Sequence, residues 1–236
     1  MACPVCVVGT VGYEETTHRP NRESAEVLDL HSKGLGPPDE LEGTFDGSLS
    51  CDNPLCRQRL SMAGDWQCVF NDGDPSLGTF GDIYRVRYVN PALRILVVPA
   101  GTPEPVKTAI ASASAVLWLS PSAAANRLRH AVEELLTAKK VRKTTKSKSG
   151  KRVRLNLHDR IVAFHKTHPD VADALEAVKW IGNDGSHDSD LTVPDVLTGA
   201  EILDLAIKAL YDKSDAALKA KVKAINKSKG LPKKKV

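Results

Sequence analysis

Two closely spaced pairs of cysteines constrain this chain more than any other feature of its sequence. Cys3 and Cys6 form a C-x2-C pair, and Cys51 and Cys56 form a C-x4-C pair. Two thiolates on one short turn can converge on a single ion, and a second such turn completes the tetrahedral shell that zinc prefers. Four protein ligands leave no position for water, so the binding energy would contribute to folding. The sequence therefore predicts a structural Zn²⁺ bound by Cys3, Cys6, Cys51 and Cys56.

The spacing of the two pairs leaves an alternative open. The 44 residues between them are a long insertion for a minimal zinc ribbon, and ordinary reduced thiols would also explain the cysteines. An odd number of cysteines without a signal peptide argues against a disulfide framework. The fifth cysteine, Cys68, is expected to be a small buried hydrophobe in a strand. His18 is the closest alternative ligand.

Positive charge is concentrated in two segments. Residues 139–154 carry nine Lys or Arg and no acid, and residues 216–236 carry eight Lys and no acid. The chain has a net charge of +4, so the remaining residues sum to −13. Such segments attract the phosphates of RNA or DNA through counterion release, although a solvated loop and tail is the alternative. The candidate nucleic-acid-binding residues are Lys139, Lys140, Arg142, Lys143, Lys146, Lys148, Lys151, Arg152 and Arg154.

Hydropathy argues against a membrane protein. No stretch approaches the roughly 18 consecutive apolar residues that a membrane span requires. The N-terminus lacks the basic region and apolar core of a secretory signal. With 42% hydrophobic residues, the chain has enough apolar side chains to form a core. We expect a cytoplasmic protein with no membrane contact.

The hydrophobic pattern changes from strand-like to helical along the chain. Residues 83–89 and 93–99 are rich in β-branched and aromatic residues and predict short strands. From about residue 104 the apolar residues recur at helical spacing, and one stripe contains Leu128, Val132, Leu135 and Leu136. We expect four or five helices with no strand between them, which would form a bundle.

These patterns predict an α+β protein in three parts. A zinc-ribbon-like module with short strands occupies residues 1–100. A helical bundle occupies residues 101–215, and a flexible basic tail occupies residues 216–236.

Three motifs in the second half of the chain resemble the domain-of-unknown-function 4145 family. They are NRLRHAVEELL at 126–136, LHDRIVAF at 157–164 and VKWIGNDGSH at 178–187, followed by an amphipathic helix that ends in Leu-Tyr. Members of this family commonly have an LR…E helix, a helix with Leu and Ile, and a GN…H signature. Many relatives also carry an N-terminal ribbon of paired cysteines, which agrees with the first module.

The resemblance implies a HEPN-like bundle, because the family is placed near the HEPN superfamily. Many HEPN proteins are dimers that cleave RNA with an arginine and a histidine four to six residues apart on one helix. The matching positions here imply His187 as general acid or base, with Asn183 beside it and Lys179 or Arg129 as the cation at the phosphate. No arginine occupies its usual place, so RNase activity is expected to be weak or absent. A purely structural role for Asn183 and His187 is the alternative.

Two other pairs of polar residues have simpler interpretations. Arg160 and His165 have the HEPN spacing, but we expect them to be a chance match that faces solvent on an amphipathic helix. Arg129 and Glu133 are expected to form an ion pair within their helix.

These features predict a zinc-binding accessory protein that contacts nucleic acid or a protein partner and forms a homodimer through its helical domain. The resemblance implies a setting in phage defence or nucleic-acid processing, because such domains accompany restriction and toxin proteins. The alternatives are a metal-independent ribonuclease that uses His187 and an interaction scaffold without affinity for nucleic acid.

Overall fold

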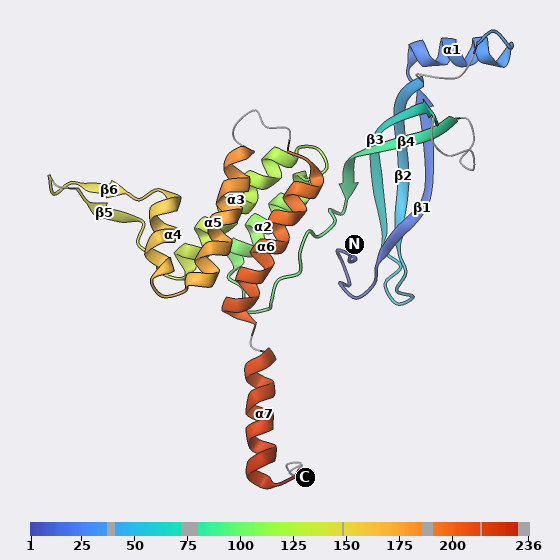
Figure 1. The fold of residues 1–236 in the computed structure, drawn as a ribbon. Coiled ribbons are helices and arrows are strands. Elements are labelled where there is room, and N and C mark those ends of the chain that lie inside the picture. The colour runs from blue at the N-terminus through green and yellow to red at the C-terminus, as the bar shows by residue number, and fades with distance from the viewer. Residues whose placement is uncertain (37–40, 72–79, 148, 186–190, 213, 231–236) are drawn as a thin grey trace.

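The computed structural model of the chain describes residues 1–36, 41–71, 80–147, 149–185, 191–212 and 214–230. It contains an N-terminal β-sheet module and a C-terminal helical bundle, which are joined by residues 91–103 without regular structure (Figure 1). The expectation of a protein that combines strands and helices is therefore confirmed.

The N-terminal module is a four-stranded antiparallel sheet in the order β1-β2-β3-β4. Its strands are β1 (Val11–Pro20), β2 (Leu41–Cys51), β3 (Arg59–Phe70) and β4 (Phe80–Asn90). Alternate residues of the central strands point to one face and form a core, as expected for an antiparallel sheet with one solvated side. The largest of these core residues are Leu41, Phe45, Leu60, Met62 and Trp66.

The long insertion between the cysteine pairs is part of this sheet. It forms β1, helix α1 (Arg22–Ser32) and nearly all of β2, none of which is predicted from the sequence. Asn21 caps α1 by accepting a hydrogen bond of 2.8 Å from the amide of Ser24. Leu28 of α1 packs against the core of the sheet, so the insertion is integrated into the module.

The prediction of a strand at residues 93–99 is wrong, whereas the strand predicted at 83–89 lies within β4. The apolar residues of 93–99 connect the two cores of the molecule. Leu93 is buried in the core of the sheet, and Ile95 packs against the core of the bundle. The Ile95 amide donates to Ser114 Oγ at 3.3 Å, a side-chain acceptor in place of a strand partner.

The helical bundle consists of five helices: α2 (Glu104–Val116), α3 (Pro121–Ala138), α4 (Leu157–His165), α5 (Pro169–Asp184) and α6 (Val193–Tyr211). Helix α3 contacts each of the other four. Its predicted stripe of Leu128, Val132, Leu135 and Leu136 is completely buried. Each such side chain stabilises the fold by about 1.5–3 kcal/mol relative to an exposed one, which makes α3 the centre of the bundle.

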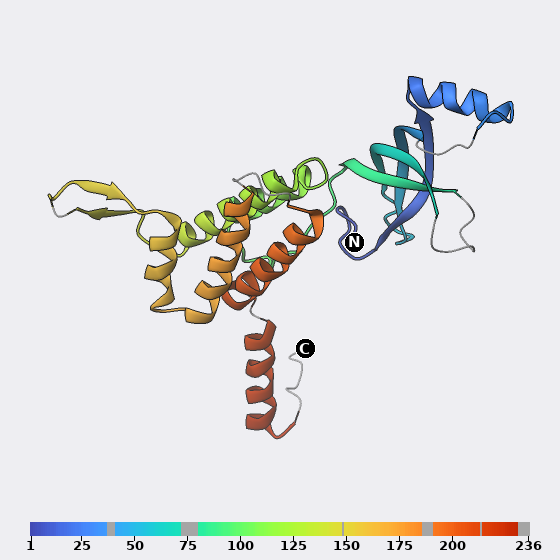
Figure 2. The same ribbon diagram turned by 45° about the horizontal axis from the view of Figure 1, so that its top comes forward.

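Two basic elements project from the bundle in different directions (Figures 1 and 2). The expectation of no strand between the helices is wrong, because β5 (Thr144–Lys146) and β6 (Arg152–Arg154) form a hairpin between α3 and α4. Helix α7 (Ser214–Ser228), which is not predicted, follows α6. Among the described residues, none of the helices has the length and apolar character needed to cross a membrane.

Candidate metal centre and nucleic-acid interface

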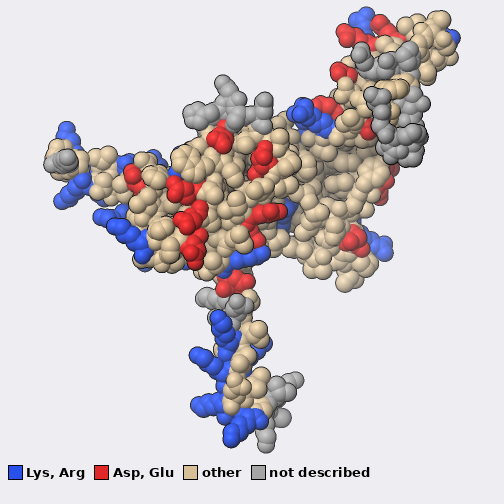
Figure 3. All heavy atoms as spheres, in the orientation of Figure 1, with Lys and Arg blue, Asp and Glu red and all other residues tan. Residues whose placement is uncertain are grey.

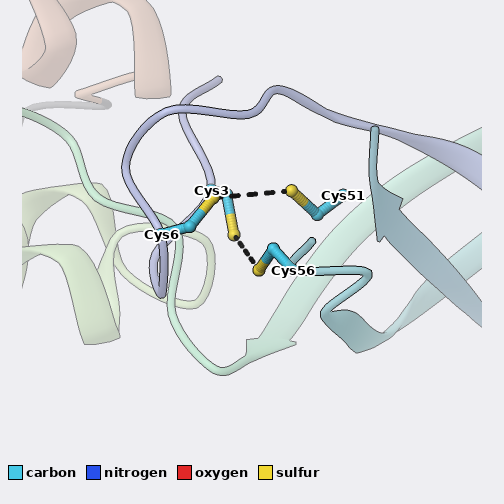
Figure 4. A group of neighbouring side chains, drawn as sticks. All are labelled: Cys3, Cys6, Cys51 and Cys56. Carbon is cyan, nitrogen blue, oxygen red and sulfur yellow. Dashed lines mark hydrogen bonds between the residues drawn. The ribbon is translucent and has the colours of Figure 1, made fainter. Parts of the chain in front are cut away.

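The four paired cysteines meet at one end of the sheet (Figure 4). Their sulfur atoms all lie within 4.8 Å of one another. Cys3 Sγ is 3.8 Å from Cys56 Sγ, and Cys6 Sγ is 3.7 Å from Cys51 Sγ. Four sulfurs at 2.3 Å from a tetrahedral zinc ion are separated by about 3.8 Å, whereas disulfide sulfurs are about 2.05 Å apart. The spacing therefore fits a cluster that can hold a metal ion, and it does not fit two disulfides.

The backbone around each cysteine pair makes the same turn. Val7 and Arg57 directly follow the second cysteine of their pairs, and both have left-handed conformations, with φ of 63° and 48°. Such a φ is costly for a β-branched residue and persists only where surrounding contacts impose it. Gly9 lies so close to the cluster that a Cβ atom would be 2.5 Å from Cys51 Sγ. The cysteine spacing alone does not predict this requirement, although a glycine beside a cysteine turn is a recognisable sequence signal.

Polar groups around the cluster contact its sulfurs and loops. The Gly9 amide donates to Cys6 Sγ at 3.3 Å and lowers the pKa of that thiol to about 6. Burial raises the pKa of Cys51 to about 12. A bound cation would favour the thiolate at both positions, since metal binding displaces the thiol proton. Asp52 accepts from the Thr10 amide at 2.7 Å and ties the two cysteine loops together.

The alternative ligand His18 and the fifth cysteine, Cys68, lie elsewhere in the sheet. His18 stacks on Trp66 with the ring centroids 4.2 Å apart. Cys68 is buried in the core of the sheet, as expected for a small hydrophobe. Neither residue belongs to the group of four sulfurs.

The hairpin presents a basic face. In the antiparallel register, Lys146 pairs with Arg152 and Thr144 pairs with Arg154. Side chains two residues apart on a strand point to the same side, so Lys146, Arg152 and Arg154 share one face. All three are exposed. Figure 3 shows Lys and Arg gathered on the hairpin, apart from the acidic residues on the bundle.

The other candidate nucleic-acid-binding residues lie in the same segment of the chain. Lys140, Arg142, Lys143 and Lys151 are also exposed. Lys139 is half-buried, and its Nζ lies 4.3 Å from the centroid of the Tyr211 ring. Lys148 lies outside the described residues. Helix α7 adds a second group of cations: Lys219, Lys221, Lys223 and Lys227.

The GN part of the family signature lies at the contact between α3 and α5. A Cβ atom on Gly182 would be 2.6 Å from Arg129 Cβ and 3.2 Å from the Ala125 carbonyl oxygen, so glycine allows the close approach. Arg129 donates to the side-chain oxygen of Asn183, whereas we expected it to pair with Glu133. Asn126 donates to the Gly185 carbonyl at 3.2 Å. These contacts join the two helices, and the role of Asn126 is not predicted from the sequence.

Lys179 points toward α4 and not toward Asn183. It is 3% exposed, and its Nζ donates to Glu176 at 3.0 Å and lies 3.3 Å from His158 Nδ1. The bond from Lys179 lowers the pKa of the Glu176 carboxyl. Lys179 therefore contacts α4, whereas Arg129 contacts Asn183. His187 lies outside the described residues.

The expectation that Arg160 and His165 face solvent together is wrong. Arg160 is 6% exposed and donates to Thr137 Oγ1 at 3.0 Å across the contact with α3. His165 is exposed and lies 3.4 Å from a carboxylate oxygen of Asp173. Residues five apart on a helix point in different directions, since each residue turns the helix by about 100°.

The comparisons with known proteins give one match to the chain, from a family profile. No curated protein and no solved structure matches the chain. The sequence profile of a domain of unknown function, DUF4145, matches residues 111–228, which include most of the bundle, the hairpin and α7. Because the match covers half of the 236 residues, the chain belongs to the DUF4145 family.

Proposed function

We propose that this protein is a zinc-binding accessory protein that contacts double-stranded nucleic acid through its basic hairpin. The observation that carries the proposal is the shared exposed face of Lys146, Arg152 and Arg154 on a projecting two-stranded ribbon. The major groove of B-DNA admits a two-stranded β-ribbon, and basic side chains on such a ribbon reach phosphates on both sides of the groove.

The charge around the hairpin supports this assignment. Residues 139–154 contain no acid, so no carboxylate within the segment competes with phosphate for its cations. Each phosphate contact releases counterions, and this release supplies most of the affinity at low salt. The lysines of α7 offer a second place for phosphate contact.

The zinc ion has a structural role in this proposal. Four thiolates complete its shell, so no open position is left for substrate or water. The two left-handed residues and the close approach of Gly9 to Cys51 Sγ support this role, because both loops bring their sulfur atoms to one point. We propose zinc as the ion because a cluster of four thiolates selects it over harder cations.

The proposal is tested by the salt dependence of binding. We expect a fluorescein-labelled DNA duplex to bind the full chain with an affinity that falls steeply as salt rises, measured by fluorescence anisotropy. A Lys146→Ala, Lys151→Ala, Arg152→Ala variant removes three cations near the end of the hairpin. If each contacts one phosphate, the slope of log K against log salt should decrease in magnitude by about 2.7.

The matched control removes three exposed cations from the N-terminal module. An Arg19→Ala, Arg22→Ala, Lys33→Ala variant has the same change in net charge, and each of these cations already faces a carboxylate. Its salt slope should equal that of the wild type. Equal slopes for both variants would overturn the proposal, and no binding at low salt would favour the scaffold without nucleic-acid affinity.

Three further expectations remain predictions from the family resemblance. They are the HEPN-like character of the bundle, the homodimer and a setting in phage defence.

A further inference from the structure

A cavity of about 420 Å³ lies where the hairpin joins the bundle. It is enclosed by α3, by the ends of the hairpin strands and by the first turns of α4. We call it the root cavity. Its volume lies near the lower end of the range for small-molecule sites, which is about 300–1,000 Å³. It has room for a ligand of roughly the size of one nucleotide.

A buried, incompletely paired arginine lines the root cavity. Arg160 is 6% exposed, and one of its terminal nitrogens donates to Thr137 Oγ1. Within the described part of the chain, its buried Nε has no hydrogen-bond partner. Burial lowers the pKa of this guanidinium, and the carboxylates of Glu133 and Glu134 offset only part of that effect. A buried guanidinium whose Nε is unpaired is costly, so an anion held in the cavity that this residue lines would stabilise its charge.

Other positive groups line the same cavity. Lys143 and Arg154 come from the two ends of the hairpin, and both are exposed. The nine-residue helix α4 begins at the cavity, where Asn156 caps it by accepting from the Asp159 amide at 2.8 Å. The start of a helix carries a partial positive charge that favours an anion such as phosphate.

The α3 side of the root cavity has the opposite character. Glu133 and Glu134 are partly exposed there, next to His130. Carboxylates of this kind accept hydrogen bonds from sugar hydroxyls, as acidic residues do in dinucleotide sites. One side of the cavity therefore suits a phosphate, and the other suits groups that donate hydrogen bonds.

We propose that the root cavity binds a 5′-phosphorylated ribonucleotide, with its phosphate at Arg160, Arg154 and Lys143 and its hydroxyls at Glu133 and Glu134. The nucleotide is either free or the first residue of an RNA strand, and neither case depends on the duplex contact proposed above for the hairpin. A phosphate dianion is complementary to three cations and a helix start, and its charge would offset the cost of burying the Arg160 guanidinium.

Thermal melts of the full chain with AMP or adenosine test this proposal. A ligand that binds only the folded state raises the melting temperature. We expect AMP to raise it and adenosine, which lacks the phosphate, to leave it unchanged. Arg154→Ala should abolish the shift, because it removes a cation that contacts the phosphate. Arg154 is exposed, so its loss leaves the core intact. Lys166→Ala, which removes one exposed cation beyond the end of α4, should keep it.

Arg160→Met separates a ligand-binding role from a structural one. Replacing a buried charge whose Nε has no partner removes its desolvation cost, and the loss of one hydrogen bond to Thr137 is small by comparison. Glu133 and Glu134 stay partly exposed to solvent, so neither becomes a buried unpaired charge. We therefore expect this variant to melt at or above the wild-type temperature without AMP and to lose the shift with AMP. A lower melting temperature together with a retained AMP shift would show that Arg160 is only structural, and would overturn its assignment as a phosphate ligand.

Two RNA strands distinguish the source of the phosphate. A preference for a 5′-phosphorylated strand over a 5′-hydroxyl strand would identify an RNA end, and AMP binding without that preference would identify a free nucleotide. No AMP shift in the wild type, or an equal shift in Arg154→Ala, would overturn the proposal. The hairpin variant with Lys146, Lys151 and Arg152 replaced should retain AMP binding, so the duplex assay and the AMP assay fail independently.

Discussion

Replacing Gly182 with alanine should destabilise the bundle, although alanine is the better helix former. The new Cβ atom would lie 2.6 Å from Arg129 Cβ and 3.2 Å from a carbonyl oxygen of α3, so the two helices must move apart. Such overpacking costs about 1–3 kcal/mol, and weakening the Arg129–Asn183 hydrogen bond costs about 1 kcal/mol more. The gain in helix propensity is about 1 kcal/mol. The free energy of unfolding should therefore fall by about 1–3 kcal/mol.

Urea denaturation followed by circular dichroism at the helix band measures this change. A loss of 2 kcal/mol shifts the midpoint by roughly 1 M urea, at a typical dependence of about 2 kcal/mol per molar. Gly199→Ala is the matched control, since Gly199 is a buried helical glycine whose new Cβ would meet side chains alone: Ile181 at 3.3 and 3.5 Å and Leu128 at 3.8 Å. It should be neutral or stabilise by up to about 1 kcal/mol. A Gly182→Ala variant as stable as the wild type would refute the packing argument.

Two further predictions concern the metal centre and the start of α6. Purified protein should contain one zinc ion per chain, and Cys3→Ser or Cys51→Ser should release the ion and unfold the β-sheet module. Metal analysis measures the zinc content, and circular dichroism measures the unfolding. Full retention of zinc in both variants would contradict the prediction. Asp195 accepts from the Thr192 amide and hydroxyl, and the hydroxyl bond is the main cause of its lowered pKa. Because this pKa is lower in the folded state, its contribution to stability is present at neutral pH and is lost as pH falls through the folded value. Asp195→Asn should therefore melt below the wild type at pH 7 and approach it in strong acid, and an equal difference at both pH values would contradict the assignment.

The features that the sequence predicts well are those that depend on local spacing. Cysteine pairs on short turns and the apolar stripe of α3 are determined by residues a few positions apart. The strand β1 escapes prediction because most of its side chains are exposed, which removes the alternation that identifies a half-buried strand. The segment 93–99 has strand-like residues, but its apolar side chains pack into the two cores. In both cases the surroundings of the segment in the folded chain, and not its local pattern, determine its structure.

The candidate sites also combine features that local sequence predicts with features that depend on the fold. The basic residues of 139–154 are visible as a run of charge, but their division between two faces of a ribbon depends on the hairpin register. The burial of Arg160 cannot be predicted from an amphipathic pattern, because arginines are mostly exposed and this one is covered by α3. The root cavity combines residues from α3 with residues from the hairpin and α4 that the fold brings together, so no sequence motif identifies it.

The joint between the sheet and the bundle has a mechanical consequence. Arg94, in the connecting segment, donates to the Pro4 carbonyl at 2.9 Å, and Pro4 lies between two of the clustered cysteines. Trp118 packs against both cores from the bundle side. The cysteine loop thus anchors the connecting segment as well as its own module. If the cluster binds a metal ion, loss of that ion would loosen this anchor, and the occupancy of the cluster would govern how stiffly the protein holds its two halves.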